Sequence, residues 1–269
     1  MMKGLLVVSH ISVLLASLSM VGAGCAGELP SRPQVNVAPS IANESYGAWK
    51  TVGADIERFE VPPASPTSTH LVLYRFRPEA FQWSFAYASS SQRISDWVRA
   101  KPGMNLVVNA AYFDTDFTPT GFLQINGERI GRRQFDLDRS SLVQIDRVPQ
   151  IVERVTGPKE LERVQNGAQS YPLLIQNGGG AIAEDSGLLA RRTAIGTDTK
   201  GRIYLIIAPD QPVTLYRFME QLVGMGIQWK SVLNFDGGPS SGVSIRSGNW
   251  SEMYDSFTSI PIVLTARHL

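Results

Sequence analysis

The stretch Val232-Leu233-Asn234-Phe235-Asp236-Gly237-Gly238-Pro239-Ser240-Ser241-Gly242 organises the predicted fold. A short apolar run ends at Asp236, two glycines and a proline then impose a sharp bend, and Val243 and Ile245 resume an alternating pattern. This order predicts a strand, a tight turn and a second strand. Because glycine lets backbone N–H groups approach an anion closely, the turn also predicts an anion cradle beside Asp236. The alternative is an ordinary hairpin turn whose Asp and Ser side chains cap the backbone.

The N-terminus has the order of an export signal. Lys3 precedes an apolar run over residues 5–21, and the small residues 22–24 precede Cys25. Residues 1–24 are therefore predicted to be a signal peptide. Cys25 is the only cysteine, so an intramolecular disulfide is excluded. The segment Gly22-Ala23-Gly24-Cys25 resembles a bacterial lipobox, which predicts lipidation of Cys25 and membrane anchoring in the cell envelope; simple secretion or periplasmic release is the alternative.

The remaining chain is predicted to hold one folded domain. Residues 25–48 are rich in Pro, Ser, Asn and Ala and lack a periodic apolar pattern, which indicates a tether. Residues 49–269 fit the length of a single domain with a substantial core. The formal charge is +1 and basic residues are interspersed, so nucleic acid is not indicated as a partner.

Short β-rich runs outnumber helical patterns in this domain. We predict strands over residues 70–76, 81–87, 142–145 and 203–207, the second with aromatic residues at alternate positions. Helical spacing predicts helices over residues 91–100 and 215–223, the latter capped by Thr214. The predicted class is α+β: a strand-rich single domain with twisted, mostly antiparallel sheets and a few helices.

Two helix–strand units echo each other. Each has a helix, a glycine turn, and a buried strand that ends in asparagine, Asn109 in one unit and Asn234 in the other. An aromatic residue and an aspartate follow each asparagine. If the echo is an internal duplication, the two asparagines should meet in one cleft; chance similarity of two such units is the alternative.

Four segments in order over residues 70–266 carry a resemblance to a known family. Asn109-Ala110-Ala111-Tyr112-Phe113 resembles an Asn-Gly-Gly-Phe-Phe motif, and Pro172-Leu173-Leu174-Ile175 with Asn177-Gly178 resembles a Pro-x-Leu segment. Arg191-Arg192-Thr193-Ala194-Ile195-Gly196 resembles an Arg-Thr-Ala-x-Gly motif, and residues 233–241 resemble Asn-Leu-Asp-Gly-Gly-Gly-Ser-Ser. Together they are similar to the phosphodiester glycosidase family. Alanines replace two glycines, Phe235 replaces leucine, and Pro239 replaces the third glycine and removes one N–H from the cradle.

The resemblance implies cleavage at the anomeric carbon of a sugar-1-phosphodiester, giving free sugar and a phosphomonoester. An ordinary glycosidase needs two carboxylates, whereas a phosphate already leaves readily. One carboxylate, implied to be Asp236, would then stabilise or attack the oxocarbenium-like centre, and Arg192 would clamp the phosphate. Substrate-binding roles are implied for Asn109, Thr193, Asn234, Gly237, Gly238, Ser240 and Ser241.

Each role has a structural alternative. Arg192 is also compatible with a surface charge beside Arg191, and Thr193 with a turn cap. The side chains of Asn109 and Asn234 are also compatible with satisfying backbone groups at strand ends. We favour function for Asp236 and Arg192, and leave both interpretations open for the asparagines and serines.

Two other function classes compete. An envelope protein that binds glycan or glycan phosphate without catalysis could use the same cleft, and the departures at Ala110 and Pro239 support it. A serine hydrolase is the third, because residues 238–242 match G-x-S-x-G and Asp255 and His268 follow in triad order. That motif needs a helix after the serine, whereas Val243 and its neighbours alternate as a strand, and His268 is the penultimate residue.

No cofactor is indicated. Three scattered histidines and one cysteine give no zinc pattern. Asp114, Asp116 and Asp236 are the oxygen ligands that could form a calcium site, and the alternative for Asp114 and Asp116 is a solvated turn before Pro119.

Overall fold

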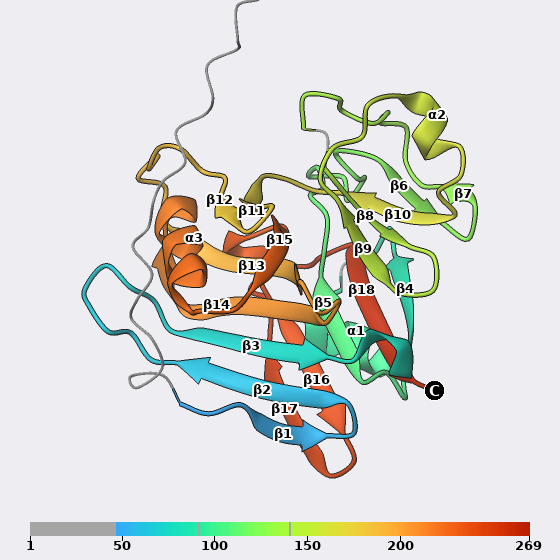
Figure 1. The fold of residues 1–269 in the computed structure, drawn as a ribbon. Helices are drawn as coiled ribbons and strands as arrows, with labels where there is room; N and C mark the ends of the chain where they lie inside the picture. Colours follow the sequence, from blue (N-terminus) through green and yellow to red (C-terminus); the bar gives the residue numbers. More distant parts are fainter. Residues whose placement is uncertain (1–46, 91, 140) are drawn as a thin grey trace, which may run out of the picture. The chain divides into compact units, whose positions relative to one another are not determined.

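The computed structural model describes residues 47–269 except positions 91 and 140. The predicted signal peptide, Cys25 and all but the end of the predicted tether lie outside these residues. Strands dominate the described chain, and every ladder between described strands is antiparallel (Figure 1). The strand-rich, antiparallel prediction is confirmed. Because helices are few and short, the fold is mostly β and fits the α+β class only loosely.

The largest sheet has eight strands and carries most of the predicted motifs. In spatial order its strands are β1 (Lys50–Gly53), β2 (Ile56–Val61), β3 (Leu71–Phe76), β14 (Ile203–Val213), β13 (Ala190–Asp198), β15 (Trp229–Asn234), β11 (Leu173–Gln176) and β12 (Gly179–Gly180).

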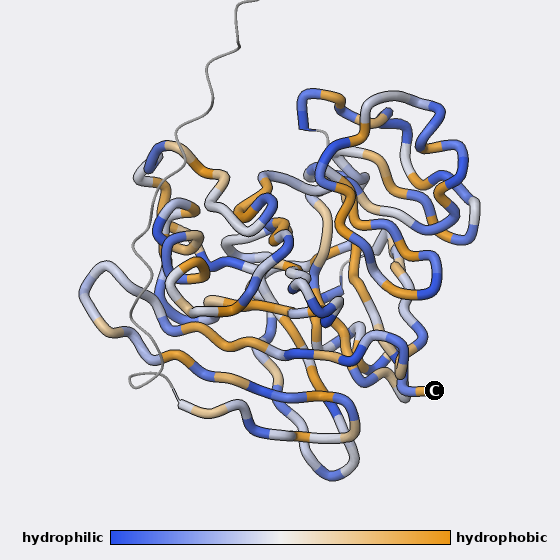
Figure 2. The backbone as a smooth tube through the Cα atoms, in the orientation of Figure 1, coloured by the Kyte–Doolittle hydropathy of each residue, from blue (hydrophilic) through white to orange (hydrophobic). Residues whose placement is uncertain are grey.

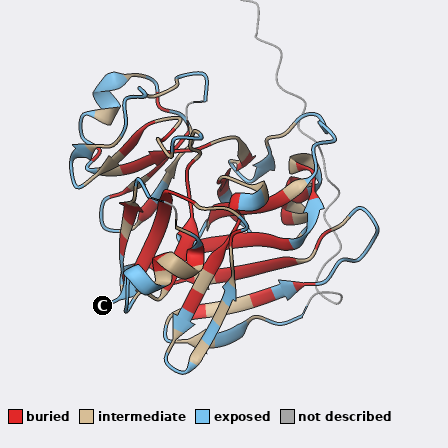
Figure 3. Cartoon of the chain, turned by 180° about the vertical axis from the view of Figure 1, so that it is seen from behind, coloured by how far each residue is buried: buried red, intermediate tan, exposed pale blue. Residues whose placement is uncertain are grey.

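A five-stranded sheet shares a core with it. Its strands in order are β17 (Trp250–Tyr254), β16 (Val243–Ser247), β5 (Leu106–Asn109), β18 (Ile262–His268) and β4 (Phe81–Tyr87). Ile195 and Leu205 from the large sheet and Leu106 and Leu264 from the smaller one belong to one buried cluster. Buried residues, red in Figure 3, accordingly follow the inner strands of both sheets.

A second five-stranded sheet adds to the same core. Its strands in order are β7 (Glu128–Arg129), β6 (Leu123–Ile125), β10 (Asn166–Gln169), β8 (Leu142–Ile145) and β9 (Pro149–Val152). Leu123, Val143 and Ala168 join the central cluster, whereas Leu142 and Val164 belong to a separate small cluster near the short helix α2 (Pro158–Leu161).

Two helices cover outer sheet faces. Helix α3 (Leu215–Gly224) packs Phe218 and Leu222 into a cluster with Val232 of the large sheet, and Thr214 caps it by accepting a hydrogen bond from the Arg217 amide at 3.2 Å. Helix α1 (Ile94–Ala100) packs on the sheet that contains β5. Both predicted helices are confirmed, although α1 begins later than predicted. None of the helices in the described part of the chain is long and apolar enough to cross a bilayer.

Alternation of side chains explains why β13 and β15 lie in the middle of the large sheet. Ile195 and Leu233 face the central core, whereas Ala194 and Val232 face the α3 side. Both faces of this strand pair are therefore apolar, and the strands of the large sheet carry much of the orange in Figure 2. All four strands predicted from the sequence are present, at β3, β4, β8 and β14.

The connection from β15 to β16 crosses from one sheet to another. It contains a 3₁₀ turn, η2 (Gly238–Ser240), and a second such turn, η1 (Pro78–Ala80), joins β3 to β4. The predicted order of strand, turn and strand is present. The alternative of a simple hairpin is wrong, because β15 and β16 do not pair with each other. The turn after Asp236 therefore lies where the two sheets meet.

Candidate active site

The four family-like segments converge at one end of neighbouring strands. Segments 172–178, 191–196 and 233–241 lie on or after β11, β13 and β15, which are adjacent in the large sheet. The segment that begins at Asn109 leaves the end of β5 in the other sheet. Hydrogen bonds of the Asn109 side chain join this strand end to the turn that follows β15.

Asn109 is buried, and both ends of its side-chain amide bond the backbone. Its Nδ2 donates to the Asp236 carbonyl at 2.7 Å, and its Oδ1 accepts from the Gly242 amide at 3.0 Å. The side chain therefore spans the turn from its first residue to its last. The two asparagine-bearing strand ends do meet, and both polar atoms of the Asn109 side chain bond the backbone of the turn, which fits the structural alternative better than contact with a sugar.

Asp236 is a partly buried carboxylate at this junction. Its amide donates to the Ala110 carbonyl at 2.8 Å, and its Oδ1 accepts from the Gly237 amide at 2.9 Å. Burial raises the pKa of Asp236 to about 6, although hydrogen bonds from the Ser240 hydroxyl and the Gly237 amide lower it in part. A carboxylate of this kind is ionised at neutral pH and can still accept a proton readily.

Most N–H groups of the turn are already bonded within it, which corrects the predicted cradle in part, because only the Gly238 amide is left without a hydrogen bond in the described residues. The amide of Gly237 is bonded to Asp236, and the amides of Ser240 and Ser241 donate to the Gly237 and Gly238 carbonyls at 3.2 and 3.3 Å. Proline at 239 has no N–H. These bonds close the 3₁₀ turn, so other groups must supply most donors for an anion.

Arg192 is a buried guanidinium rather than a surface charge. Only 8% of the residue is exposed, and its Nε and Nη2 donate to the carbonyls of Val213 and Leu188 at 2.9 and 2.7 Å. Burial lowers the pKa of Arg192, but a guanidinium keeps its charge. No salt bridge joins it to a carboxylate in residues 47–269 outside positions 91 and 140. An unpaired buried cation is a strong attractor for an anionic ligand.

Backbone packing explains the glycine at 237. A Cβ atom there would lie 2.9 Å from the Arg191 carbonyl and 3.8 Å from Arg192 Nη1. The turn is thus in direct contact with the arginine pair at the start of β13. Arg191 is also buried, donates to the Pro209 and Asp255 carbonyls, and lies under the exposed ring of Phe257.

Asn234 links the site to a residue that sequence reasoning missed. Its Nδ2 lies 2.6 Å from the Tyr112 hydroxyl, 3.1 Å from the Tyr171 carbonyl and 2.7 Å from the Phe235 carbonyl. The rings of Tyr112 and Tyr171 stack with centroids 4.5 Å apart. Tyr112 lies within one of the four family-like segments. The aromatic residue that follows each asparagine in the two helix–strand units is the sequence feature that could have predicted its place in the site.

Several buried polar atoms at this site have no partner. Six buried side-chain nitrogen or oxygen atoms lack one in the described residues, and four of them belong to the site segments. Buried polar atoms in proteins are nearly always paired, so these four indicate space for water or ligand groups. They are Arg191 Nη1, Thr193 Oγ1, Asn234 Oδ1 and Ser241 Oγ.

The sequence over residues 102–262 matches the family model described as phosphodiester glycosidase. This match covers more than half of the chain. The chain belongs to the phosphodiester glycosidase family.

Two solved structures share the fold of this phosphodiester glycosidase family member. The catalytic domain of zebrafish N-acetylglucosamine-1-phosphodiester alpha-N-acetylglucosaminidase, auto-inhibited by its pro-peptide, superposes with a TM-score of 0.60 at 13% identity and 86% coverage of both chains. A hypothetical protein from Synechocystis gives a TM-score of 0.56 at 14% identity, covering 79% of this chain and 62% of that one. Comparison with curated protein sequences gave no match.

The Ser-Asp-His arrangement of the competing hydrolase hypothesis is not assembled. His268 Nε2 lies 3.0 Å from Asp55 Oδ2, and Asp255 Oδ1 accepts from the Ser95 and Ser256 amides. Ser240 bonds Asp236 instead, and the strand β16 follows where the elbow motif needs a helix. The serine hydrolase alternative is therefore wrong.

The candidate calcium ligands are not gathered either. Asp114 forms an ion pair with Arg133 at 3.1 Å, and Asp116 caps its own turn by accepting from Thr118. Within the described residues no group of three His, Cys, Asp or Glu is placed to hold a metal ion. The solvated-turn interpretation therefore fits Asp114 and Asp116.

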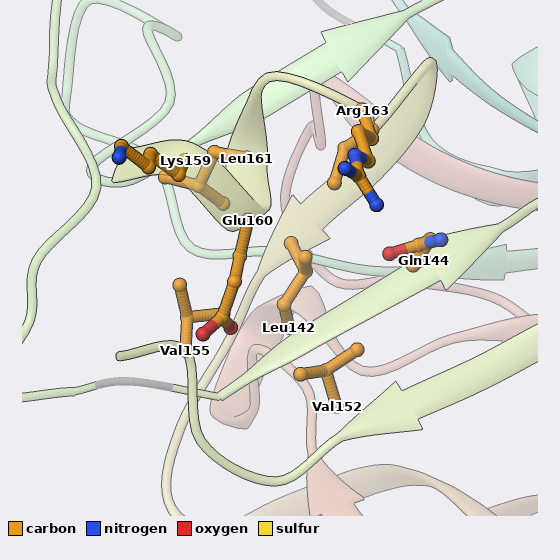
Figure 4. Close-up of a pocket in the computed structure, with 9 residues that line it drawn as sticks. Leu142, Gln144, Val152, Val155, Lys159, Glu160, Leu161 and Arg163 are labelled. Atoms are coloured by element: carbon orange, nitrogen blue, oxygen red, sulfur yellow. The ribbon is translucent and has the colours of Figure 1, made fainter. Parts of the chain in front are cut away.

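Two cavities lie outside this set of residues. One, of about 450 Å³, is lined by apolar residues such as Leu142 and Val152 together with Lys159, Glu160 and Arg163 (Figure 4), and it contains no predicted site residue. The other, of about 490 Å³, includes Leu189 and Val213 in its lining. The Arg192 side chain donates hydrogen bonds to the carbonyls of Val213 and of Leu188, the residue before Leu189. This second cavity therefore adjoins Arg192.

Proposed function

We propose that this protein is a glycosidase that hydrolyses the anomeric C–O bond of a sugar-1-phosphodiester to free sugar and a phosphomonoester. The observation that carries the proposal is the placement of Asp236 and Arg192. A carboxylate whose pKa burial raises to about 6 and a buried guanidinium without a carboxylate partner lie at the ends of two paired strands. Family membership supports the same reaction class.

The chemistry needs fewer groups than ordinary glycoside hydrolysis. The C1–O bond breaks with its electron pair leaving on the phosphate, which requires no protonation to depart. The Asp236 carboxylate stabilises or attacks the positive centre that develops at C1. Water then adds to C1, and Asp236 is a suitable acceptor for the proton that water loses.

Arg192 would hold the phosphate throughout. Its Nε and Nη2 are fixed by two backbone carbonyls, so its Nη1 is the group left to contact an anion beside Gly237. Such a fixed donor costs no reorganisation during the reaction. Thr193 and Ser241 carry hydroxyl oxygens without partners, and Gly238 and Ser240 complete the turn that faces the substrate.

The sugar is the less defined half of the substrate. The zebrafish relative is named for N-acetylglucosamine-1-phosphodiester, and at 13% identity it supports the class of bond and not this particular sugar. Asn234, with its unpaired Oδ1, is the residue we propose to contact a sugar hydroxyl.

A second candidate is a non-catalytic protein that binds glycan phosphate in the cell envelope. The closed hydrogen bonding of the turn favours it, because the amides of Gly237, Ser240 and Ser241 are unavailable to stabilise developing charge. The raised pKa of Asp236 favours catalysis instead, because a purely binding site for an anion gains nothing from a buried carboxylate.

We also propose that the protein is exported and anchored in the envelope through lipid on Cys25. The support is the sequence alone: the apolar segment 5–21, the small residues 22–24 and the single cysteine. Residues 49–269 would then form the glycosidase domain behind the tether 25–48.

A product assay tests the reaction. The full chain and its Asp236→Asn variant are incubated with a panel of sugar-1-phosphodiesters, and free sugar, sugar phosphate and phosphomonoester are quantified. We expect free sugar plus phosphomonoester from the wild type and a loss of about 10²-fold or more in kcat for the variant, which keeps size but removes charge. Release of sugar phosphate plus alcohol would contradict the assignment, and binding without turnover would favour the second candidate.

A further inference from the structure

The phosphate in this site needs more donors than Arg192 alone supplies. Amides of the turn after β15 are largely bonded within the turn, and Pro239 has none. The groups that remain are hydroxyls. Ser240 bonds Asp236, whereas the hydroxyls of Thr193 and Ser241 have no partner and the phenol of Tyr112 adjoins Asn234.

The orientation of the Asn234 amide is fixed by its surroundings. Its Nδ2 lies within hydrogen-bonding distance of two backbone carbonyls, those of Tyr171 and Phe235. Carbonyl oxygens only accept, so exchanging the amide oxygen and nitrogen would place three acceptors together. The atom 2.6 Å from the Tyr112 oxygen is therefore a nitrogen that donates.

This assignment leaves the Tyr112 proton available. An amide nitrogen cannot accept a hydrogen bond, so the Tyr112 hydroxyl accepts from Asn234 and must send its own hydrogen elsewhere. In residues 47–269 outside positions 91 and 140, no hydrogen bond takes that proton. The hydroxyl is thus held by one bond and presents an unused donor.

The hydroxyl lies over the strand ends that carry the proposed catalytic pair. Ala194 pairs with Asn234, the Phe235 amide donates to the Thr193 carbonyl at 2.8 Å, and a Cβ atom added at Gly237 would lie 3.8 Å from Arg192 Nη1, so the chain around Asp236 runs beside Arg192. The negative charge of Asp236 and the positive charge of Arg192 also both act on the pKa of Tyr112, which burial raises, so the phenol stays neutral.

We propose that the Tyr112 hydroxyl donates a hydrogen bond to the phosphate of the substrate and stabilises it as the leaving group. This inference rests on the proposed function. As the C1–O bond breaks, negative charge grows on the phosphate, and the hydrogen bond from Tyr112 strengthens while the proton stays on the phenol. A role as nucleophile is disfavoured, because a neutral phenol attacks poorly.

The test compares two tyrosines from one aromatic stack. Tyr112→Phe removes only the hydroxyl and keeps the ring against Tyr171. Tyr171→Phe is the matched control, because its hydroxyl accepts from Arg139 Nη1 at 2.8 Å and belongs to no proposed substrate contact. Both are made in the full chain, and their thermal midpoints are measured to compare folding.

Three quantities are measured for each protein: kcat and KM on the sugar-1-phosphodiester that turns over, the Kd of phenyl phosphate, and the Kd of the free sugar. A lost hydrogen bond to a charged group typically costs about 10- to 100-fold, so Tyr112→Phe should lower kcat by that factor and weaken phenyl phosphate binding about 10-fold. Free-sugar binding should not change, and Tyr171→Phe should stay within about 2-fold of wild type in all three. A structural role for Tyr112 would weaken both ligands equally.

The outcomes separate this inference from the proposed function. If Tyr112→Phe equals Tyr171→Phe in kcat and in phenyl phosphate binding, the inference is overturned and the glycosidase assignment stands. If wild type binds phenyl phosphate but turns over no substrate, the catalytic assignment fails, and the binding ratio of the two variants decides whether Tyr112 contacts phosphate. If wild type does neither, both are overturned.

Discussion

Asp236 holds a charge that the folded protein disfavours. Its pKa is raised to about 6 from 3.8, chiefly by burial, so the native state binds a proton more tightly than the unfolded chain. For a raised acid pKa, stability falls as pH rises from about 4 to about 6 and stays lower above that window. A site that tolerates this cost is expected to use the carboxylate for chemistry.

Asp236→Asn should therefore be more stable than wild type at pH 7. A shift of this size corresponds to about 1 to 3 kcal/mol, because each pKa unit is worth about 1.4 kcal/mol. Denaturant unfolding at pH 7 and pH 4 measures it, and the advantage should shrink towards pH 4, where the native carboxyl is protonated. A variant less stable than wild type at pH 7 would contradict the electrostatic account of Asp236.

Arg192 can be tested against its neighbour on the same strand. Arg191 and Arg192 are both buried and each donates to two backbone carbonyls, so a lysine at either position loses similar backbone contacts. We expect Arg192→Lys to lower kcat/KM for the phosphodiester by about 10- to 100-fold, with Arg191→Lys close to wild type. Steady-state kinetics check this, and equal losses would mean that the arginines only support the fold.

The sequence predicted the charged residues of the site better than its polar ones. Asp236 and Arg192 were predicted from their segments, and the structure buries Arg192 in β13 and partly buries Asp236 just after β15. The partners of Asn109 could not be predicted, because it bonds the carbonyl of a residue 127 positions later. Only the meeting of two sheets brings those backbone groups together.

At the scale of elements, the turn after β15 depends on close backbone contact. Gly237 has an extended backbone that any residue can adopt, so backbone strain does not require glycine there. A side chain is excluded by steric overlap instead, because an added Cβ atom would lie 2.9 Å from the Arg191 carbonyl. Gly238 has φ near +61° and nothing within 4 Å of an added Cβ, so it meets only conformational strain.

Alanine at these two positions should have different effects. Gly237→Ala should lower kcat/KM about 10-fold or more, because the turn must move away from Arg191 and carries Asp236 with it. Gly238→Ala should cost about 1 kcal/mol of stability and keep activity within a few-fold. Paired kinetic and unfolding measurements distinguish them, and a larger activity loss for Gly238→Ala would contradict the packing argument.

Element types were predictable because their periodicities are local. The period of two in β4 and the helical spacing with a Thr214 cap in α3 require no knowledge of distant residues. The sheet to which each strand belongs is a long-range property. The strands on either side of Gly237 therefore looked like a hairpin in sequence, although they lie in different sheets.

On the scale of the whole molecule, three sheets share the central core, and the helices only cover outer faces. The predicted α+β class fits only loosely, because both predicted helices are present but are short beside a fold built mainly of strands. The predicted antiparallel pairing is present throughout the described strands.

The location of the whole protein is open to a direct test. If Cys25 carries lipid, Cys25→Ala should move most of the protein from the membrane fraction to the soluble fraction of a bacterial host. Immunoblotting of the fractions measures this, with Ser244→Ala in the folded domain as a control. Unchanged membrane retention of Cys25→Ala would argue against a lipid anchor.

The central claim is that the C–O bond at the anomeric carbon breaks, and not a P–O bond. Cleavage of the C1–O bond and cleavage of the neighbouring P–O bond both give free sugar and a phosphomonoester, so the products alone do not distinguish them. Hydrolysis in water enriched in ¹⁸O does, because the oxygen from water joins a different product in each case. The mass of the released phosphomonoester is measured after turnover by wild type. The account predicts a phosphomonoester without ¹⁸O, since the water oxygen joins the sugar; a phosphomonoester carrying one ¹⁸O would contradict it.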